Sequence, residues 1–216
     1  MLSRFDDYPI HQTADPLFQS ASSDRFQYDR YWYNAHAADG SFYFGVAMCR
    51  YPNLGILDCS LSVAVDGRQY AFHGSRRAPH EPTDTSVGPF TLQILEPMGR
   101  HRVVIEANDT GIECDLLFTP RTACIEEGRQ TLRNERHIVM DATRLDQFGF
   151  WSGWIRCGDV EIQVDGSTTF GLKDRSWGIR PVGEAYPGGA PLSEFQAVHF
   201  CWMPIHWEDE CSLAGW

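Results

Sequence analysis

The sequence lacks the apolar segments that would send it into or across a membrane. No run approaches the roughly 20 apolar residues of a membrane-spanning helix, and residues 1–9 contain no apolar core of a signal peptide. We therefore expect a cytoplasmic chain that does not insert into membranes. Its 216 residues are enough for one good hydrophobic core and part of a second.

Closely spaced cysteine pairs are also missing. The cysteines are odd in number and scattered, at Cys49, Cys59, Cys114, Cys124, Cys157, Cys201 and Cys211. Disulfide frameworks and zinc ribbons use regular, paired spacings, so reduced core thiols are the better interpretation. His199-x-Cys201 and the His206–Cys211 segment contain metal-ligating residue types, but their spacing matches no zinc pattern. We expect no metal.

Nucleotide-binding and serine-hydrolase signatures are absent as well. There is no glycine-rich phosphate loop after a strand, no Gly-x-Ser-x-Gly elbow and no dinucleotide fingerprint. These absences disfavour nucleotide-dependent chemistry and serine hydrolysis, and we expect no cofactor. Positive charge is scarce too: 18 Lys and Arg stand against 29 Asp and Glu, for a net charge of −11. That balance argues against nucleic acid or an anionic membrane as a partner.

Aromatic residues and two-residue alternation, in contrast, are abundant. Aromatics make up 13% of the chain and include seven Trp, which favours β structure and apolar cavities. Apolar side chains alternate with polar or small ones over residues 41–50 and 56–65, and Asp66-Gly67 then predicts a tight hairpin turn. Short strands with turn residues at regular spacing predict an all-β antiparallel sandwich or barrel.

The pattern divides the chain into three parts. Residues 1–24 are expected to be an N-terminal arm, and residues 25–186 a β domain, within which residues 120–136 are weakly patterned and compatible with a short helix. Residues 187–216 are expected to hold a linker and the first strands of a second β domain. The apolar strand at 195–203 lacks a partner within the first domain, which predicts either a homodimer or a longer natural protein with a further C-terminal domain.

The most informative motif is Gly-Leu-Lys-Asp-Arg-Ser-Trp-Gly at residues 171–178. Its carboxyl group, Asp174, is a candidate general acid, because an aromatic wall raises a carboxyl pKa by removing water. A neighbouring cation has the opposite effect, so the alternative is a structural ion pair with Lys173, Arg175 or Arg180. Aromatic walls are available at Trp151, Trp154 and Trp177, each of which is expected either to contact a ligand or to pack in the core.

Further candidates lie on two earlier strands. Tyr31, Tyr33 and His36 are candidates to line a pocket, and the imidazole has a pKa suited to proton transfer near neutrality. Asp58 lies on the polar face of an otherwise apolar strand. It either points into a barrel as the second carboxylate of an acid/base pair or faces solvent.

Three segments together resemble a bacterial family with two lipocalin-like domains, related to the AttH-like proteins and the carotenoid hydratases (hydroxyneurosporene synthases). They are Tyr-Asn-Ala-His at 33–36, Arg-Tyr-Pro-Asn-Leu-Gly-Ile-Leu-Asp at 50–58 and the motif at 171–180. The most specific part is Lys-Asp-Arg-Ser-Trp-Gly at 173–178. The family usually has His after this Asp, whereas this chain has Arg175. The resemblance covers roughly residues 25–216 and implies a lipocalin-like β-barrel with an apolar cleft.

Two functions follow as hypotheses. The first is a cofactor-independent hydratase, isomerase or cyclase that acts on an apolar alkene, such as an isoprenoid or steroid-like compound. In it Asp174 supplies the proton, Tyr33, His36 or Asp58 places water or accepts a proton, and the aromatic residues and Arg175 contact the substrate. The alternative is a non-catalytic protein that binds a hydrophobic small molecule. An acid beside three tryptophans favours the enzyme.

Overall fold

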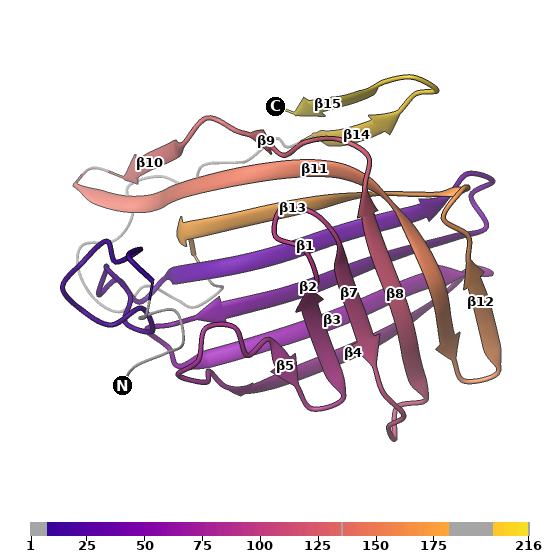
Figure 1. The fold of residues 1–216 in the computed structure, drawn as a ribbon, viewed down its shortest axis with the longest axis horizontal. Helices are drawn as coiled ribbons and strands as arrows, with labels where there is room; N and C mark the ends of the chain where they lie inside the picture. The colour runs from indigo at the N-terminus through magenta and orange to yellow at the C-terminus, as the bar shows by residue number, and fades with distance from the viewer. Residues whose placement is uncertain (1–7, 135, 182–200, 216) are drawn as a thin grey trace.

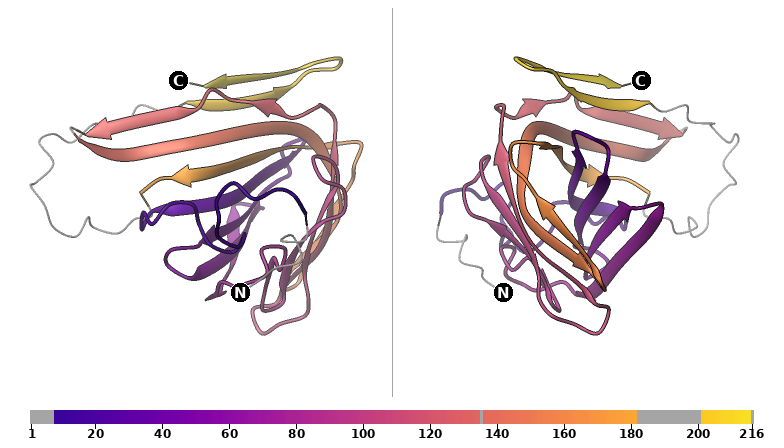
Figure 2. Two further views of the ribbon diagram at one scale, coloured as in Figure 1. Left: turned by 60° about the vertical axis from the view of Figure 1, so that its left-hand side comes forward. Right: turned by 90° about the vertical axis from the view of Figure 1, so that its right-hand side faces the viewer.

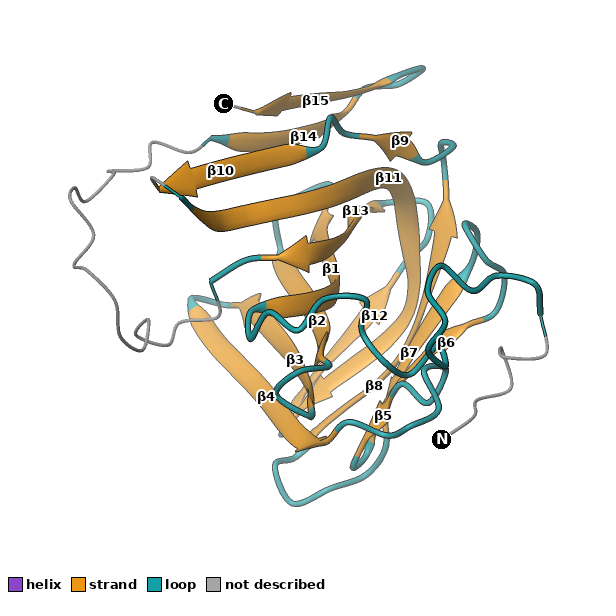
Figure 3. Ribbon diagram, turned by 90° about the vertical axis from the view of Figure 1, so that its left-hand side faces the viewer, coloured by secondary structure: helices purple, strands orange, loops and turns teal. Residues whose placement is uncertain are grey.

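The computed structural model describes residues 8–134, 136–181 and 201–215, and all regular secondary structure in this part of the chain is β-strand (Figures 1 and 3). The strands are β1 (Gln27–Ala37), β2 (Phe42–Tyr51), β3 (Ile56–Val65), β4 (Arg68–Arg77), β5 (Ser86–Val87), β6 (Phe90–Ile94), β7 (His101–Ile105), β8 (Ile112–Pro120), β9 (Ile125–Glu126), β10 (Gln130–Asn134), β11 (His137–Cys157), β12 (Val160–Val164), β13 (Thr169–Ile179), β14 (Trp202–His206) and β15 (Cys211–Gly215). These described residues include no helix with the length and apolar character needed to cross a membrane.

Thirteen of the strands form one antiparallel sheet that curls on itself. Its main order is β4-β3-β2-β1-β13-β11-β8-β7-β6-β5, with β9, β10 and β12 paired to β11. The sheet folds over so that β1 to β4 lie behind β6 to β8 (Figures 1 and 2), and the edge strand β5 contacts β3 and β4. The prediction of an all-β, lipocalin-like antiparallel barrel is confirmed.

The interior of the barrel follows from the alternation along each strand. In β3, Leu57, Cys59, Leu61 and Val63 are buried, while the intervening Asp58 and serines lie on the other face. Asp66 and Gly67 join β3 to β4 with φ angles of 51° and 70°. Both are left-handed, as a two-residue hairpin turn requires. The predicted turn is therefore confirmed.

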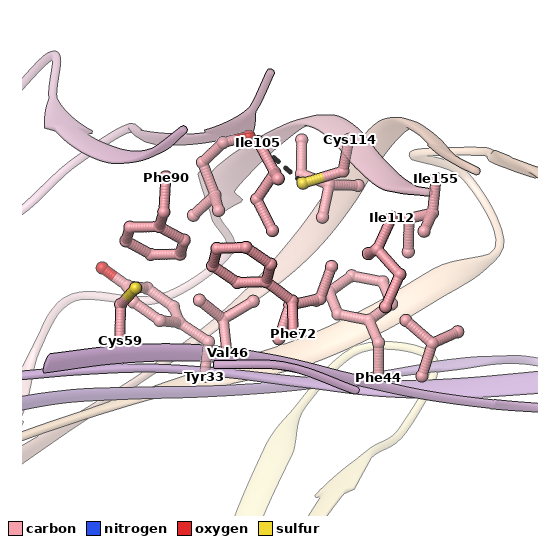
Figure 4. Packing of buried hydrophobic residues seen from close by; sticks show 14 of the residues in the cluster. Tyr33, Phe44, Val46, Cys59, Phe72, Phe90, Ile105, Ile112, Cys114 and Ile155 are labelled. Atoms are coloured by element: carbon pink, nitrogen blue, oxygen red, sulfur yellow. Dashed lines mark hydrogen bonds between the residues drawn. The ribbon is translucent and has the colours of Figure 1, made fainter. Parts of the chain in front are cut away.

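The core of the barrel is rich in aromatic rings (Figure 4). Trp151 lies at its centre, fully buried, with its ring against those of Tyr33, Phe44 and Phe118. Its indole N–H donates to the carbonyl oxygen of Asn34 at 3.2 Å. The prediction that Trp151 contacts a ligand is not supported by its position, because the residue is enclosed by other core side chains.

All seven cysteines are free thiols, as expected for reduced residues. Those at positions 49, 59, 114 and 157 are buried. Burial raises the pKa of the thiol at Cys114 to about 12, because the charged thiolate loses its hydration inside the barrel. These thiols therefore act as small apolar core groups.

The long strand β11 is where the fold departs most from the sequence prediction. The sequence pattern alone predicts one strand over residues 137–142 and another over 150–157, but both stretches belong to a single strand of 21 residues. β11 pairs with β13 along its first half and with β8 and β12 along its second half, and it bends between them (Figures 1 and 2). At Gly149 an added Cβ would lie 2.4 Å from the Phe118 ring and 2.6 Å from the Thr119 carbonyl oxygen. Only glycine permits this approach.

The short helix considered for residues 120–136 is wrong for the described part of that segment. β9 and β10 lie there instead and pair with β11. The pattern is weak because both are exposed edge pieces with little apolar surface to bury.

The hairpin of β14 and β15 forms a separate two-stranded sheet that lies over β9 and β11 (Figures 1 and 3). Arg121 fastens it by donating to the carbonyl oxygens of Trp207 at 2.8 Å and Glu208 at 2.7 Å. His206 Nε2 lies 3.1 Å from the carbonyl oxygen of Gly171. The expected linker at 187–191 and most of the strand at 195–203 lie outside the described residues, so the second domain stays a prediction.

The positions of Trp151 and Trp177 predict that replacing each with alanine lowers the free energy of unfolding by a different amount. Trp151→Ala should lower the free energy of unfolding by about 3–5 kcal/mol, because it leaves a large cavity in a packed core. The matched control Trp177→Ala should cost less than about 1 kcal/mol, since Trp177 is 39% exposed. Urea unfolding followed by far-UV circular dichroism measures both. Equal losses would contradict the assignment of Trp151 to the core.

Candidate active site

Strand register sorts the residues of the 171–178 motif onto two faces of the sheet. β13 lies between β1 and β11, and Lys173 is opposite Tyr33 on one side and Gln147 on the other. Arg175 is likewise opposite Tyr31 and Leu145. Tyr33 belongs to the core, and cross-strand neighbours share a face. Lys173, Arg175 and Trp177 therefore point into the barrel, and Asp174 points out of it.

The inward-pointing residues line an open pocket of about 420 Å³ at one end of the barrel. The β6–β7 segment and the long strands supply its apolar wall: Tyr31, Ile94, Pro97, Met98, Leu145 and Trp177. Its polar lining consists of Asp29, His101, Lys173 and Arg175. An apolar wall with a few converging polar groups is the usual form of a small-molecule site.

A buried tyrosine–histidine pair adjoins this pocket: His101 lines it, and Tyr33 contacts His101 from behind. The Tyr33 hydroxyl and His101 Nδ1 are 2.5 Å apart, and both side chains are almost fully buried. Burial, together with the charges of Lys173 and Arg175, lowers the pKa of His101 to about 3. Burial also raises the pKa of Tyr33 well above its ordinary value. At neutral pH the pair is a neutral phenol hydrogen-bonded to a neutral imidazole.

Two basic side chains lie beside this pair. The Arg175 guanidinium carbon is 4.2 Å from the centroid of the Tyr31 ring, and Arg175 forms an ion pair with Asp29. Although burial opposes it, Asp29 holds the pKa of Arg175 above its ordinary value. Lys173 is 2% exposed, and its amine donates to Gln147 Oε1 at 2.5 Å. Burial lowers the pKa of this amine, and the Arg175 charge adds to the effect.

The pocket therefore offers hydrogen-bond donors to an oxygen atom of a ligand. Among the described residues that line it, the carboxylate is that of Asp29, which is engaged with Arg175. Such donors stabilise negative charge that develops on a carbonyl, enol or phenol oxygen. The same groups would disfavour a free carbocation, because like charges repel strongly in a site with little water.

The predicted ligand-binding residues are divided by this geometry. Tyr31, Arg175 and Trp177 line the pocket, and Tyr33 lies directly behind it. Trp154 is on the outer face, where Arg156 lies over its ring at 5.9 Å. The expected arrangement, with an acid and three tryptophans in one cavity, is wrong. Of Trp151, Trp154 and Trp177, only Trp177 lines the pocket.

The predicted acid Asp174 is on the outer face, in a cluster of charged groups. It pairs with Arg30 at 2.7 Å, and its strand neighbour on β11 is Asp146. Burial raises the pKa of Asp174, although Arg30 and Arg144 oppose the change. This arrangement matches the structural alternative, an ion pair, with Arg30 in place of the expected partners.

Asp146 is the more perturbed of the two carboxyl groups. It is 1% exposed, and no donor from the described part of the chain reaches either of its carboxyl oxygens. The pKa of Asp146 is raised to about 8; burial is the largest cause, and the adjacent carboxyl group of Glu127 is the next largest. A buried carboxylate without donors and beside another carboxyl group is unfavourable, so Asp146 is protonated at neutral pH.

The other two predicted catalytic residues are also outside the barrel. Asp58 lines a shallow outer groove of about 480 Å³ together with Arg30 and His73. Burial raises the pKa of its carboxyl group. His36 is exposed, with ring centroids 5.9 Å from Phe170 and 6.5 Å from His206. Neither residue approaches the pocket, so the acid/base pair proposed within the barrel is not assembled there.

His101 and Lys173 are the pocket residues that sequence reasoning missed. His101 is in phase with the buried Val103 and Ile105 of the same short strand, which signals an inward-pointing imidazole. Lys173 was treated only as a neighbour of Asp174. Within the described residues, no three His, Cys, Asp or Glu side chains gather in a way that would hold a metal ion. His199 lies outside them.

Fold and pocket together define a lipocalin-like barrel with a polar-ended cavity. The chain belongs to a family described as "Family of unknown function (DUF8625)", whose model matches residues 2–216. A comparison with curated protein sequences finds no match.

Among solved structures, the chain is similar to kievitone hydratase from Nectria haematococca, with a TM-score of 0.53 and 13% identity over 68% of this chain and 47% of the other. It also matches CghA with Sch210972, with a TM-score of 0.48 and 18% identity over 71% of this chain and 46% of the other. The chain thus spans about half the length of these proteins. The first likeness supports the fold. The relation to carotenoid hydratases stays a prediction.

The protonated state of Asp146 predicts how stability changes with pH. The folded-state pKa of about 8 is above the ordinary value of 3.8, so the folded chain holds a proton that the unfolded chain has lost. Between about pH 4 and pH 8 this group therefore makes stability fall as pH rises, by at most about 1.4 kcal/mol per pH unit. Asp146→Asn should flatten the decline, as measured by urea unfolding at several pH values.

The exposed turn residue Asp159 provides the control, because Asp159→Asn should leave the pH dependence unchanged. Parallel declines for wild type and Asp146→Asn would show that Asp146 is ionised in the folded chain.

Proposed function

We propose that this protein is a hydratase-, isomerase- or cyclase-type enzyme that acts, by proton transfer, on an apolar molecule bearing an oxygen acceptor. The observation that carries the proposal is that His101, Lys173 and Arg175 line a largely apolar pocket, with the Tyr33 hydroxyl hydrogen-bonded to His101 behind it. Buried polar groups are costly unless they are used or paired. Here three of them line the same pocket.

The residues have distinct roles in this proposal. Arg175 and Lys173 bind the substrate oxygen and stabilise the negative charge that develops on it. The Tyr33 hydroxyl donates or receives a proton while His101 holds its orientation, since imidazole can relay the proton between its two nitrogens. Tyr31, Leu145 and Trp177 hold the apolar part and exclude water. An alkene conjugated to the oxygen-bearing group suits this set of donors better than an isolated alkene.

The similarity to kievitone hydratase supplies a first test substrate but no argument about mechanism, because the identity is 13%. The catalytic roles proposed for Asp174, Asp58 and His36 would require a different site, on the outer face of the sheet.

A second candidate function is non-catalytic binding of a hydrophobic small molecule. One observation favours it: the carboxylates put forward as proton donors lie outside the pocket, and Asp29, the carboxylate within it, is paired with Arg175. The pocket would then bind without reacting. Turnover separates the two functions.

The donors predict that the pocket recognises oxygen. β-Ionone should displace the fluorescent probe anilinonaphthalene sulfonate at least about tenfold more effectively than the hydrocarbon of the same skeleton, because a hydrogen bond from a charged donor contributes about 1.5–3 kcal/mol. Arg175→Met should reduce that preference, and the surface variant Arg156→Met should keep it. Equal displacement by ketone and hydrocarbon would contradict the proposed binding mode.

The proton-transfer role predicts a defect confined to turnover. Wild type is incubated in isotopically labelled water with kievitone and a panel of α,β-unsaturated ketones and aldehydes, and products are analysed by mass spectrometry. Tyr33→Phe keeps the ring packing and removes the hydroxyl. It should lower turnover by about 10²–10³-fold while affinity changes less than about tenfold.

Tyr43→Phe is the matched control, because Tyr43 is on the outer face and 44% exposed. It should leave turnover unchanged. If the wild type binds these compounds and converts none of them, the binding-protein function is correct instead.

A further inference from the structure

Lys173 is the only lysine in the chain, since every other member of its 18 lysines and arginines is arginine. It is also 2% exposed and points into the barrel. On a protein surface lysine and arginine are largely interchangeable, but their chemistry differs inside a pocket. An amine can lose its proton and form a covalent bond to carbon, whereas a guanidinium stays charged.

The side chains around the Lys173 amine fix its position but provide no negative charge to pair with its positive charge. Nζ donates to Gln147 Oε1 at 2.5 Å and lies 5.9 Å from the centroid of the Phe118 ring. Gln147 is itself oriented, because its amide nitrogen donates to the carbonyl oxygens of Met98 at 2.8 Å and Thr122 at 3.0 Å. Among the described residues, no carboxylate forms an ion pair with Lys173.

Burial is the largest influence on the pKa of this amine and lowers it; Cys124 opposes that change in part, and the Arg175 charge lowers the pKa slightly further. A larger share of the amine is therefore unprotonated at neutral pH than in an exposed lysine. Together, the pocket, the neutral hydrogen-bond partner and the missing counter-charge are the conditions under which a lysine is nucleophilic.

We propose that Lys173 captures aldehydes and reactive ketones that enter the pocket, by forming an imine with them. This inference deepens the proposed function by naming a carbonyl compound as substrate, and it rests on that function only in using the same pocket.

The reaction balances without any further reagent. The nitrogen lone pair attacks the carbonyl carbon, a C–N bond forms, and the carbonyl π electrons move to oxygen. A proton passes from nitrogen to that oxygen to give a carbinolamine. The C–O bond then breaks, the oxygen leaves as water after a second protonation, and an iminium remains on Lys173. Tyr33 and His101 lie beside this position and can pass the protons.

The sequence makes the test unusually direct, because the chain has only two kinds of primary amine, the ε-amine of Lys173 and its own α-amine. The protein is incubated with trans-cinnamaldehyde and sodium cyanoborohydride at pH 7. The reductant adds hydride to the iminium carbon and fixes it as a secondary amine. Peptide mass spectrometry then identifies the modified residue and measures the rate at which the adduct forms.

The matched control is Arg68→Lys, which adds an exposed amine at a surface position of an otherwise unchanged chain. We expect Lys173 to be modified at least about tenfold faster than the amine introduced at position 68, and this advantage to disappear in urea. Lys173→Met should lose the pocket adduct, with its melting curve recorded to establish folding. The Arg68→Lys comparison needs no altered pocket and stands even if Lys173→Met does not fold.

Labelling of Lys173 at or below the rate of the surface amine would overturn the proposal. Binding of cinnamaldehyde is measured separately, by probe displacement without reductant. Binding without capture rejects the imine and leaves the proposed function intact, whereas absence of binding rejects both.

Discussion

The register of three adjacent strands, β1, β13 and β11, determines both the pocket inside the barrel and the carboxyl cluster of Asp146 and Asp174 on the outer face. Side chains alternate across a sheet, so a motif of consecutive charged residues cannot act as one group. In β13, Lys173 and Arg175 enter the barrel and Asp174 between them faces outward. A shift of one residue would exchange these sets and bury the acid instead. The buried Tyr33 opposite Lys173 prevents that shift, because its ring is packed in the core.

The sequence predicts the strands well where one face is apolar and the other polar. β3 and the Asp66-Gly67 turn are examples, because burial and a left-handed backbone each demand particular residues there. The inner face of β13 could not be identified in this way. The strand directs Lys173 and Arg175 inward, whereas the apolar Leu172 is buried on the opposite face. The distribution of hydrophobic residues along β13 therefore does not indicate which face points into the barrel. The bend of β11 at Gly149 was hidden for a similar reason, since a glycine marks equally a turn or a close approach.

Buried charge is compensated differently on the outer face of the sheet and in the pocket inside the barrel. On the outer face, Asp174 is compensated by Arg30, while Asp146 avoids its charge by keeping a proton near Glu127. In the pocket, Arg175 is compensated by Asp29 and Tyr33–His101 is neutral. Lys173 is the exception, because within the described residues its amine hydrogen-bonds to an amide oxygen, Gln147 Oε1, and to no carboxylate. A ligand oxygen placed there gains a donor whose own solvation is poor, which strengthens the hydrogen bond.

That exception has a chemical consequence for any carbonyl compound held at Lys173. An imine is uncharged, but its protonated form places a positive charge beside Arg175, and the carboxylate that lines the described part of the pocket, Asp29, is already paired with Arg175. The low dielectric of the site makes that charge costly. The cost falls when electrons flow toward the nitrogen, as they do when water or an internal nucleophile adds to a conjugated double bond. If Lys173 forms the proposed iminium, the same electrostatics favour its hydration or cyclisation, and the neutral Tyr33–His101 pair lies close enough to move the protons of that step.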